Sequence, residues 1–153
     1  MSEQGRIPLW AWACAAAAAV MLAVIAAAGY DHGPTIRAIP ASEAMSDDQA
    51  REVAEKTALV WARERNAGHV ANLRELTCPD PPDTWVSHQL RRAEAGADMP
   101  QWDVVALTGF TRGPSGWTIN ALGKDNGGMF TFDIGEDGRL RACAWGSVPV
   151  PDN

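Results

Sequence analysis

Three side chains in the second half of the chain could transfer protons in an acid–base reaction: His88, Asp103 and Asp133. A carboxylate and an imidazole that reach the same substrate can remove a proton next to a carbonyl group. Both aspartates alternate with apolar residues, so each could face either a pocket or the solvent. His88 is out of phase with the apolar positions of its segment, which favours a place on the surface. We therefore expect no catalytic residue, and an enzyme that uses His88 with Asp133 or Asp103 is the least favoured hypothesis.

Other residue patterns that hold cofactors or activate nucleophiles are missing from the sequence. Lys124 lies in a Gly-Lys-Asp stretch, but a phosphate-binding loop needs an upstream glycine at the required spacing and a Ser or Thr after the lysine. Neither Ser87 nor Ser147 lies in a Gly-x-Ser-x-Gly sequence. We expect no cofactor and no metal. The formal net charge of −6 gives no electrostatic basis for binding nucleic acid, so we expect no nucleic-acid partner either.

Seven tryptophans are many for a chain of 153 residues. An indole ring buries a large apolar area but needs a partner for its N–H group. Most of the tryptophans after the first thirty residues are expected in the core. Several could instead line an apolar cavity for a lipid- or sterol-like ligand, because ligand pockets are mostly apolar with a few polar groups. The candidate pocket-lining residues are Trp61, Trp85, Trp102, Trp117, His88 and Asp133.

Cys78 and Cys143 are the two cysteines beyond the apolar N-terminal run, and an even pair in an exported domain is most simply a disulfide. The bond would close a loop of about 65 residues and stabilise the fold by roughly 4 kcal/mol in the chain-entropy model. A zinc site needs about four ligands, and the chain has no Cys-x-x-Cys or His-x-x-x-His pair to supply them. A redox-active pair is more often Cys-x-x-Cys. In a cytoplasmic domain both cysteines would instead be reduced thiols.

Residues 7–30 form an apolar run of 24 residues without a charged side chain. As a helix the run would be about 36 Å long, enough to cross a hydrocarbon core of about 30 Å. Trp10, Trp12 and Tyr30 lie near its two ends, where the aromatic side chains of membrane helices gather. Arg6 precedes the run, which favours a cytoplasmic N-terminus. We therefore expect a single-pass anchor in the lipid bilayer of the cell membrane, with the C-terminal domain extracytoplasmic.

A cleaved secretory signal is the alternative, with Ala26-Ala27-Ala28 as the small residues at the cleavage site. A signal usually has a shorter apolar core, of about 7–15 residues. The anchor hypothesis divides the chain into a cytoplasmic tail (1–6), a transmembrane anchor or uncleaved signal (7–30), a linker (31–45), an extracytoplasmic α+β domain (46–148) and a tail (149–153).

The period of the apolar residues changes from helical to alternating near Pro100. Three helices are expected before this point: one over 46–67, a short one around 70–76, and one that starts near 80–83 and ends by Gly96. Four strands are expected after it, around 102–111, 117–121, 130–134 and 140–145, joined by tight turns. Helices followed by such strands indicate an α+β fold in which one face of an antiparallel meander lies under the helices.

From residue 46 to about 147 the chain resembles small exported proteins of the nuclear transport factor 2-like (cystatin-like) superfamily. The resemblance rests on the order of the elements, on the stretch that contains Leu73, Leu76 and Cys78, and on the late Cys143. Such proteins are common in mycobacteria and their relatives, often behind one transmembrane segment, and some are associated with Mce lipid-import systems. The resemblance implies a sheet that curls into a cone with a pocket, here three helices packed on a curved four-stranded antiparallel meander.

The superfamily includes ketosteroid-isomerase-like and scytalone-dehydratase-like enzymes as well as many non-catalytic binding modules, so the fold alone leaves the function open. With an anchor, a linker and a disulfide-bonded domain but no catalytic set, the sequence favours a non-catalytic binding or accessory module of a bacterial cell envelope. Such a module would engage a partner protein or a transport assembly. The alternative is a carrier of an apolar, lipid- or sterol-like ligand in the cone, and an isomerase-like or dehydratase-like enzyme ranks last.

Overall fold

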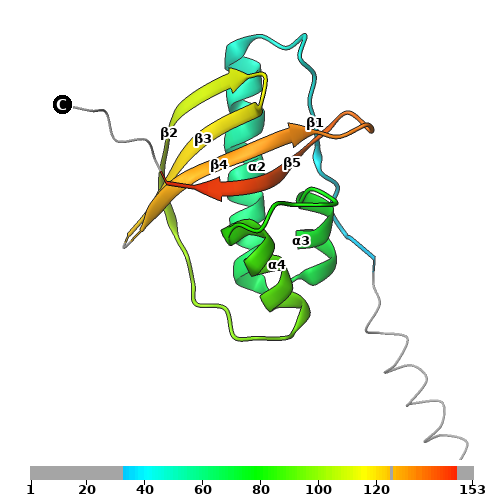
Figure 1. Ribbon diagram of the computed structural model, residues 1–153, viewed down its shortest axis with the longest axis vertical. Helices are drawn as coiled ribbons and strands as arrows, with labels where there is room; N and C mark the ends of the chain where they lie inside the picture. The colour runs from blue at the N-terminus through cyan, green and yellow to red at the C-terminus, as the bar shows by residue number, and fades with distance from the viewer. Residues whose placement is uncertain (1–32, 125, 148–153) are drawn as a thin grey trace, which may run out of the picture. The chain divides into compact units, whose positions relative to one another are not determined.

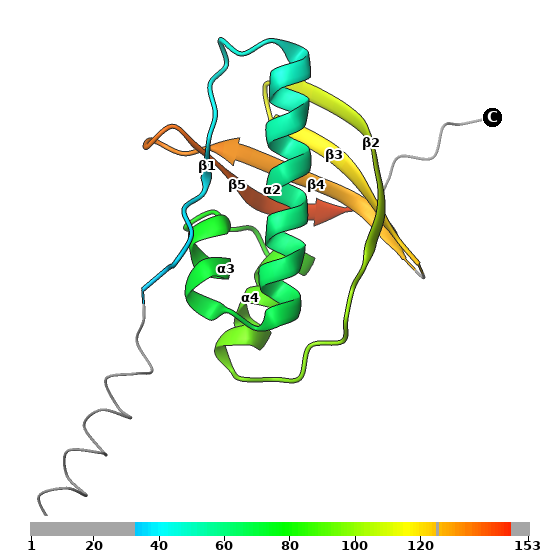
Figure 2. The ribbon, with the colours of Figure 1, turned by 180° about the vertical axis from the view of Figure 1, so that it is seen from behind.

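The computed structural model of the protein describes residues 33–124 and 126–147. They fold as an α+β domain whose five-stranded antiparallel sheet curls as a half-barrel (Figures 1 and 2). The strand order is β1-β5-β4-β3-β2. The predicted α+β class with three helices is confirmed, but the sheet has five strands rather than four. The predicted transmembrane segment lies outside the described residues, and no helix among them is both long and apolar enough to cross a membrane.

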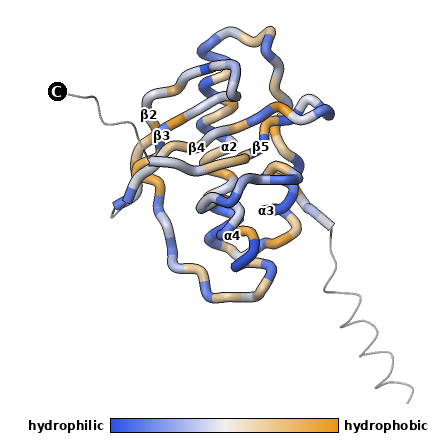
Figure 3. Tube along the Cα trace, viewed as in Figure 1, coloured by the Kyte–Doolittle hydropathy of each residue, from blue (hydrophilic) through white to orange (hydrophobic). Residues whose placement is uncertain are grey.

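The helices are α2 (Asp47–Ala67), α3 (Val70–Leu76) and α4 (Trp85–Glu94), and the strands are β1 (Ile39–Pro40), β2 (Val104–Gly113), β3 (Gly116–Gly123), β4 (Gly127–Ile134) and β5 (Arg139–Gly146). Helix α2 crosses one face of the sheet. Helices α3 and α4 lie beside the lower half of α2 in both views. Hydrophobic and hydrophilic residues follow one another at short intervals along α4 and β4 (Figure 3), as expected of elements with one buried face.

Helix α2 begins and ends where the sequence predicts. The Ser46 hydroxyl accepts a hydrogen bond from the Gln49 N–H, and the Gln49 side chain accepts one from the Ser46 N–H, which completes a capping box. At the other end Gly68 has a φ of 66°, a left-handed conformation that glycine adopts without strain. Between these ends Ala54 and Ala58 are fully buried, so the helix can lie close to the sheet.

Helix α4 begins later than predicted. The sequence placed its start near residues 80–83, but the N-cap is Thr84, whose backbone is extended (φ −127°, ψ 179°). The Thr84 N–H donates to Ser87 Oγ at 3.0 Å and to the Pro82 carbonyl at 2.8 Å. Because a residue before a proline is disfavoured in the helical conformation, the Pro81-Pro82 pair keeps the preceding backbone extended and delays the helix.

Each of the strands β2 to β4 pairs with the next one along the chain, as predicted for a meander. Ile119 of β3 lies opposite Phe130 of β4, which lies opposite Trp145 of β5. This register places large side chains of three neighbouring strands in one row on the face toward the helices, because alternate residues of a strand point to the same side.

The edge strand β2 is irregular. Its pairing with β3 shifts register between Val104 and Ala106 and again between Thr108 and Thr111. Gly109, within the second shift, has a φ of 61°. Bulges of this kind bend an edge strand and interrupt its row of free backbone groups.

The stretch that was expected to be a linker packs on the domain from Pro34 onward, and we call residues 34–46 the N-terminal strap. The strap contributes β1, in which Ile39 pairs with Leu140 of β5. Ala38, next to it, is fully buried. This is the fifth strand that the sequence analysis missed, because two residues ending in a proline show no apolar period.

An arginine fastens the end of the N-terminal strap to the β2–β3 hairpin. The Arg112 guanidinium donates to the backbone oxygens of Glu43 and Met45, at 2.6 and 2.8 Å. It also lies 3.1 Å from the carboxylates of Glu43 and Asp47. The Trp117 indole N–H donates to Glu43 Oε1 at 3.0 Å, and the Arg112 guanidinium lies 5.3 Å from the centre of the Trp117 ring.

Cys78 and Cys143 form the predicted disulfide, with Cα atoms 4.9 Å apart. The bond joins the segment after α3 to β5, as the helix-to-sheet arrangement predicted from the sequence requires. Next to it Thr77 forms a parallel bridge with Ala142, whose carbonyl accepts the Cys78 N–H at 2.9 Å. Strand β1 and Thr77 thus cover two successive parts of the same edge of β5.

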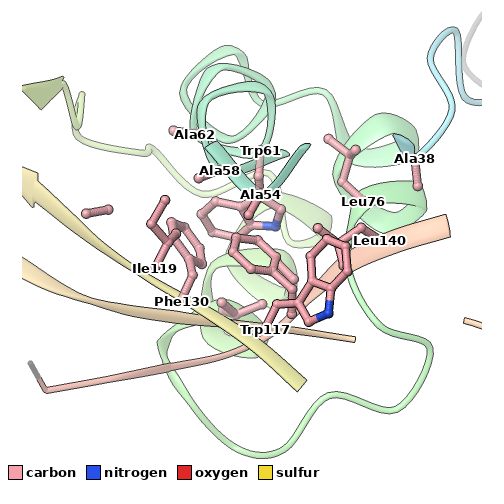
Figure 4. Close-up of a cluster of buried hydrophobic side chains, with 14 of the residues drawn as sticks. Ala38, Ala54, Ala58, Trp61, Ala62, Leu76, Trp117, Ile119, Phe130 and Leu140 are labelled. Atoms are coloured by element: carbon pink, nitrogen blue, oxygen red, sulfur yellow. The ribbon is translucent and has the colours of Figure 1, made fainter. Parts of the chain in front are cut away.

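The core lies between α2 and the sheet, and aromatic rings dominate it (Figure 4). Trp61 of α2 and Phe130 of β4 are fully buried, with ring centres 5.4 Å apart. Phe132 stacks on Phe130 at the same separation. The Trp61 N–H donates to Thr77 Oγ1 at 3.0 Å, so this buried indole is satisfied.

Candidate functional site

The structure does not bring the predicted acid–base residues together. His88 lies on α4 with 57% of its side chain exposed, and its Nε2 is 3.5 Å from Asp83 Oδ1. Its Nδ1 is 3.0 Å from a guanidinium nitrogen of Arg91. Asp133 on β4 and Asp103, just before β2, are both exposed. In the described part of the chain no hydrogen bond or ion pair joins His88 to either aspartate, so these three residues form no proton-transfer pair.

Three of the four predicted pocket-lining tryptophans lie together, and a fifth indole joins them. We call Trp61, Trp85, Trp102 and Trp145 the tryptophan cluster. The ring centres are 5.4 Å apart for Trp61–Trp85, 5.2 Å for Trp85–Trp102, 4.9 Å for Trp85–Trp145 and 5.2 Å for Trp102–Trp145. Rings at these separations are in direct contact. Trp61 and Trp102 are buried, and Trp85 and Trp145 are half-buried.

Trp117 lies apart from the tryptophan cluster. Its ring packs edge-on against Phe110 of β2 at 6.0 Å, and its N–H binds the strap carboxylate of Glu43. The sequence grouped Trp117 with the other candidates by residue type. The structure instead makes it the anchoring point of the N-terminal strap.

Trp102 carries a polar atom that the cluster leaves unsatisfied. Its side chain is nearly buried, and Nε1 has no hydrogen-bond partner among the described residues. A Cβ atom on Gly123 would lie 2.5 Å from this nitrogen, so the indole edge packs where a side chain would otherwise be. The Trp102 backbone is fixed by Asn66, whose amide accepts its N–H at 3.1 Å and donates to its carbonyl at 2.9 Å. An unpaired buried N–H costs about 1–3 kcal/mol.

The predicted site residues border separate shallow grooves that are open to the solvent. Trp102 and Asp103 line a groove between α2 and the start of β2, together with Leu59 and Val104. Asp133 lines another groove beside the β2–β3 hairpin. Asp103 therefore shares a groove with Trp102, whereas Asp133 lines a different one.

A buried carboxylate joins α2, α3 and the N-terminal strap. Glu64 is 4% exposed, and one of its oxygens lies 2.8 Å from both His69 Nδ1 and Asn72 Nδ2. The other oxygen accepts a hydrogen bond from Arg63 at 2.8 Å, and Asn72 accepts the Thr35 N–H at 2.8 Å. Burial opposes the negative charge of Glu64, but the hydrogen bonds from Asn72, His69 and Arg63 outweigh it and lower the pKa of Glu64 below its ordinary value.

Arg65 is a buried cation held by neutral oxygens. It is 4% exposed, and two of its nitrogens donate to Gln89 Oε1 at 3.1 and 2.9 Å. It also donates to the backbone oxygen of Pro100 and lies 5.7 Å from the centre of the Trp85 ring. Burial, together with repulsion from Arg92, lowers the pKa of Arg65. Arg65 thereby connects α2 to α4, which carries Trp85, and to the segment before β2, which carries Trp102.

Within residues 33–124 and 126–147 no group of three or more His, Cys, Asp or Glu side chains is placed to hold a metal ion. The chain matches no protein-family model, and no curated protein sequence matches it. The resemblance to the nuclear transport factor 2-like superfamily therefore stays a prediction.

Proposed function

We propose that this protein is a non-catalytic binding module of a bacterial cell envelope. Residues 7–30 anchor it in the membrane, the domain is extracytoplasmic, and its surface engages a partner protein or a transport assembly. The observation that carries the proposal is that the tryptophans pack together, whereas the candidate acid–base residues lie apart from one another. The tryptophan cluster packs ring against ring with Trp61 and Trp102 buried, whereas His88, Asp103 and Asp133 lie at separate places on the exposed surface.

The packing of the indoles supports surface binding over a carrier or an enzyme. A carrier needs a mostly apolar cavity, and an enzyme needs reactive groups that reach the same bound substrate. Ring centres about 5 Å apart belong to rings in contact. An apolar ligand in the cone would therefore have to displace indoles such as Trp85 and Trp145, whose centres are 4.9 Å apart.

The disulfide and the apolar run together support the extracytoplasmic location. Disulfides persist in oxidising compartments and are rare in the cytosol. Cys78 and Cys143 are bonded between the end of α3 and β5. The 24 apolar residues that precede the domain are long enough to cross a bilayer.

The first test is the location and the mass of the native protein. After membrane fractionation of the native bacterium, we expect the full-length chain in the membrane fraction. Reduction should increase its mass by two hydrogen atoms, because one disulfide opens. Recovery of the full-length chain from the soluble cytosolic fraction with free thiols would contradict the proposal.

The second test is the partner. Cross-linking in intact cells, followed by purification in mild detergent, should return one discrete envelope protein at a fixed ratio to this chain. A matched control replaces residues 7–30 with an unrelated transmembrane helix and should keep the same partner, since the domain surface is proposed to bind it. A partner-free monomer at native expression would count against the proposal, and loss of the partner in the control would assign binding to the anchor.

A further inference from the structure

The ion pairs at the C-terminal end of α2 expose the cation and bury the carboxylate. The Arg63 and His69 side chains are 64% and 60% exposed, whereas that of their partner Glu64 is 5% exposed. Arg37 of the strap is 71% exposed, whereas its partner Glu75 is 14% exposed. We call Arg37, Arg63 and His69 the cationic end. It exposes two arginine side chains on a chain whose net charge is −6.

The arrangement is reversed at the N-terminal end of α2. There Arg112 is 19% exposed, while its partners Glu43 and Asp47 are 73% and 85% exposed. The two ends are about 30 Å apart, because α2 has 21 residues. The domain therefore presents opposite charges at the two ends of its longest helix.

The chain enters the domain at the cationic end. Thr35 donates its N–H to Asn72, which also donates to Glu64, the partner of Arg63 and His69. The apolar run ends at Tyr30, five residues before Thr35. Five residues of extended chain reach about 17 Å at most. An anchored domain must therefore keep its cationic end close to the bilayer surface.

We propose, resting on the anchor of the proposed function, that the cationic end docks on lipid head groups that carry a net negative charge. Guanidinium groups bind phosphate oxygens in a two-pronged geometry, and Arg37 and Arg63 are exposed enough to do so. Each basic residue close to an anionic membrane surface strengthens binding about fivefold. The acidic end of α2 then points away from the lipid and toward the partner. Asp103 shares a groove with Arg63 and is an exposed carboxylate that opposes the docking.

The docking is tested on the full-length protein in vesicles of phosphatidylcholine alone, or of two parts phosphatidylcholine and one part phosphatidylglycerol. Spin labels are placed by Ala67→Cys, at the end of α2, or by Ser115→Cys, in the β2–β3 turn, each with Cys14→Ala. A lipid-bound nickel chelate reports the proximity of each label to the head groups. We expect stronger relaxation of the label at position 67 in the anionic vesicles than in phosphatidylcholine alone, and weak relaxation at position 115 in both.

Substitutions that each remove one positive charge then test which residues contribute to the docking. Arg37→Gln and Arg63→Gln should each reduce the ratio of docked to undocked protein about fivefold. The matched pair Arg51→Gln and Lys56→Gln, which removes exposed cations elsewhere on α2, should leave the ratio unchanged. Asp103→Asn should raise it. Equal relaxation at position 67 in both vesicle types, or an equal effect of the matched pair, would overturn the docking alone.

Flotation of the vesicles separates this inference from the proposed function. A protein that floats with both vesicle types but shows no preferred end is anchored without docking, which overturns this inference and leaves the proposed function standing. A protein that floats with neither vesicle type has no anchor, which overturns both.

Discussion

Gly128 and Trp145 fit together because residue 128 has no side chain. A Cβ atom on Gly128 would lie 2.2 Å from Cε2 of the Trp145 ring, far inside van der Waals contact. The indole packs directly over the backbone of β4, and from there it reaches Trp85 and Trp102. A glycine within a strand often marks such a close approach.

Gly128→Ala should therefore destabilise the domain by about 1–3 kcal/mol, because the added methyl group forces the Trp145 ring out of its packed position. Urea unfolding followed by tryptophan fluorescence measures the change in the free energy of unfolding. The control is Gly146→Ala on β5, where an added Cβ meets nothing within 4 Å. If both variants lost the same free energy of unfolding, the contact with Trp145 would not be the reason that position 128 needs glycine.

Removal of the disulfide should cost about 4 kcal/mol in the free energy of unfolding, because the bond closes a loop with a sequence separation of 65. The double variant Cys78→Ala/Cys143→Ala avoids a free thiol, and equilibrium unfolding in urea measures its stability. Cys14→Ala keeps the bond and should match the wild type. A double variant as stable as the wild type would mean that the bond does not constrain the unfolded chain.

Glu64→Gln should lower stability in a manner that depends on pH. The hydrogen bonds of Glu64 hold its pKa below the ordinary value of 4.5, so the unfolded chain binds the proton more readily than the folded domain. The stabilisation is thus complete above this ordinary value and is lost as pH falls through the lower folded-state pKa. The stability difference from the wild type, about 1–3 kcal/mol at neutral pH, should shrink as the pH falls below the ordinary value of 4.5.

Unfolding curves across this acidic range check the prediction for Glu64. Glu52→Gln, an exposed carboxylate on the same helix, controls for the loss of one negative charge. A difference between wild type and Glu64→Gln that stays constant or grows on acidification would contradict the assigned hydrogen bonds.

Arg112→Gln should loosen the N-terminal strap without unfolding the domain, because the guanidinium holds the backbone oxygens of Glu43 and Met45. The Ala41 amide, which donates to the Gly138 carbonyl, should then exchange its hydrogen several times faster. Amides in the middle of β4 should keep their rates. Arg91→Gln removes an exposed arginine from α4 and serves as the control. Uniformly faster exchange would indicate global destabilisation instead.

Local sequence patterns were enough to predict those parts of the fold that residues adjacent in the chain determine. The predicted helix over 46–67 matches α2, whose ends are set by Ser46, Gln49 and Gly68, because caps act within one helical turn. Alternation located the strands β3 to β5, although each extends slightly beyond the predicted range. The disulfide followed from the presence of one cysteine pair beyond the apolar run.

The parts that sequence reasoning missed depend on residues far apart in the chain. Arg63 and Arg65 lie in the same turn of α2, yet Arg63 is exposed and Arg65 is buried under Gln89, 24 residues away. Trp117 and Trp145 are equivalent as residue types, and only the sheet register decides which joins the cluster. The candidate set accordingly included the first and omitted the second.

Strand β1 and Thr77 cover the edge of β5, and two bulges interrupt the edge strand β2. Within the part of the chain that the structure describes, the sheet therefore has no long straight edge. A long straight edge would offer its free backbone groups to another copy and would template strand-by-strand polymerisation. A second copy of the domain therefore finds little free backbone in the described sheet with which to extend it strand by strand.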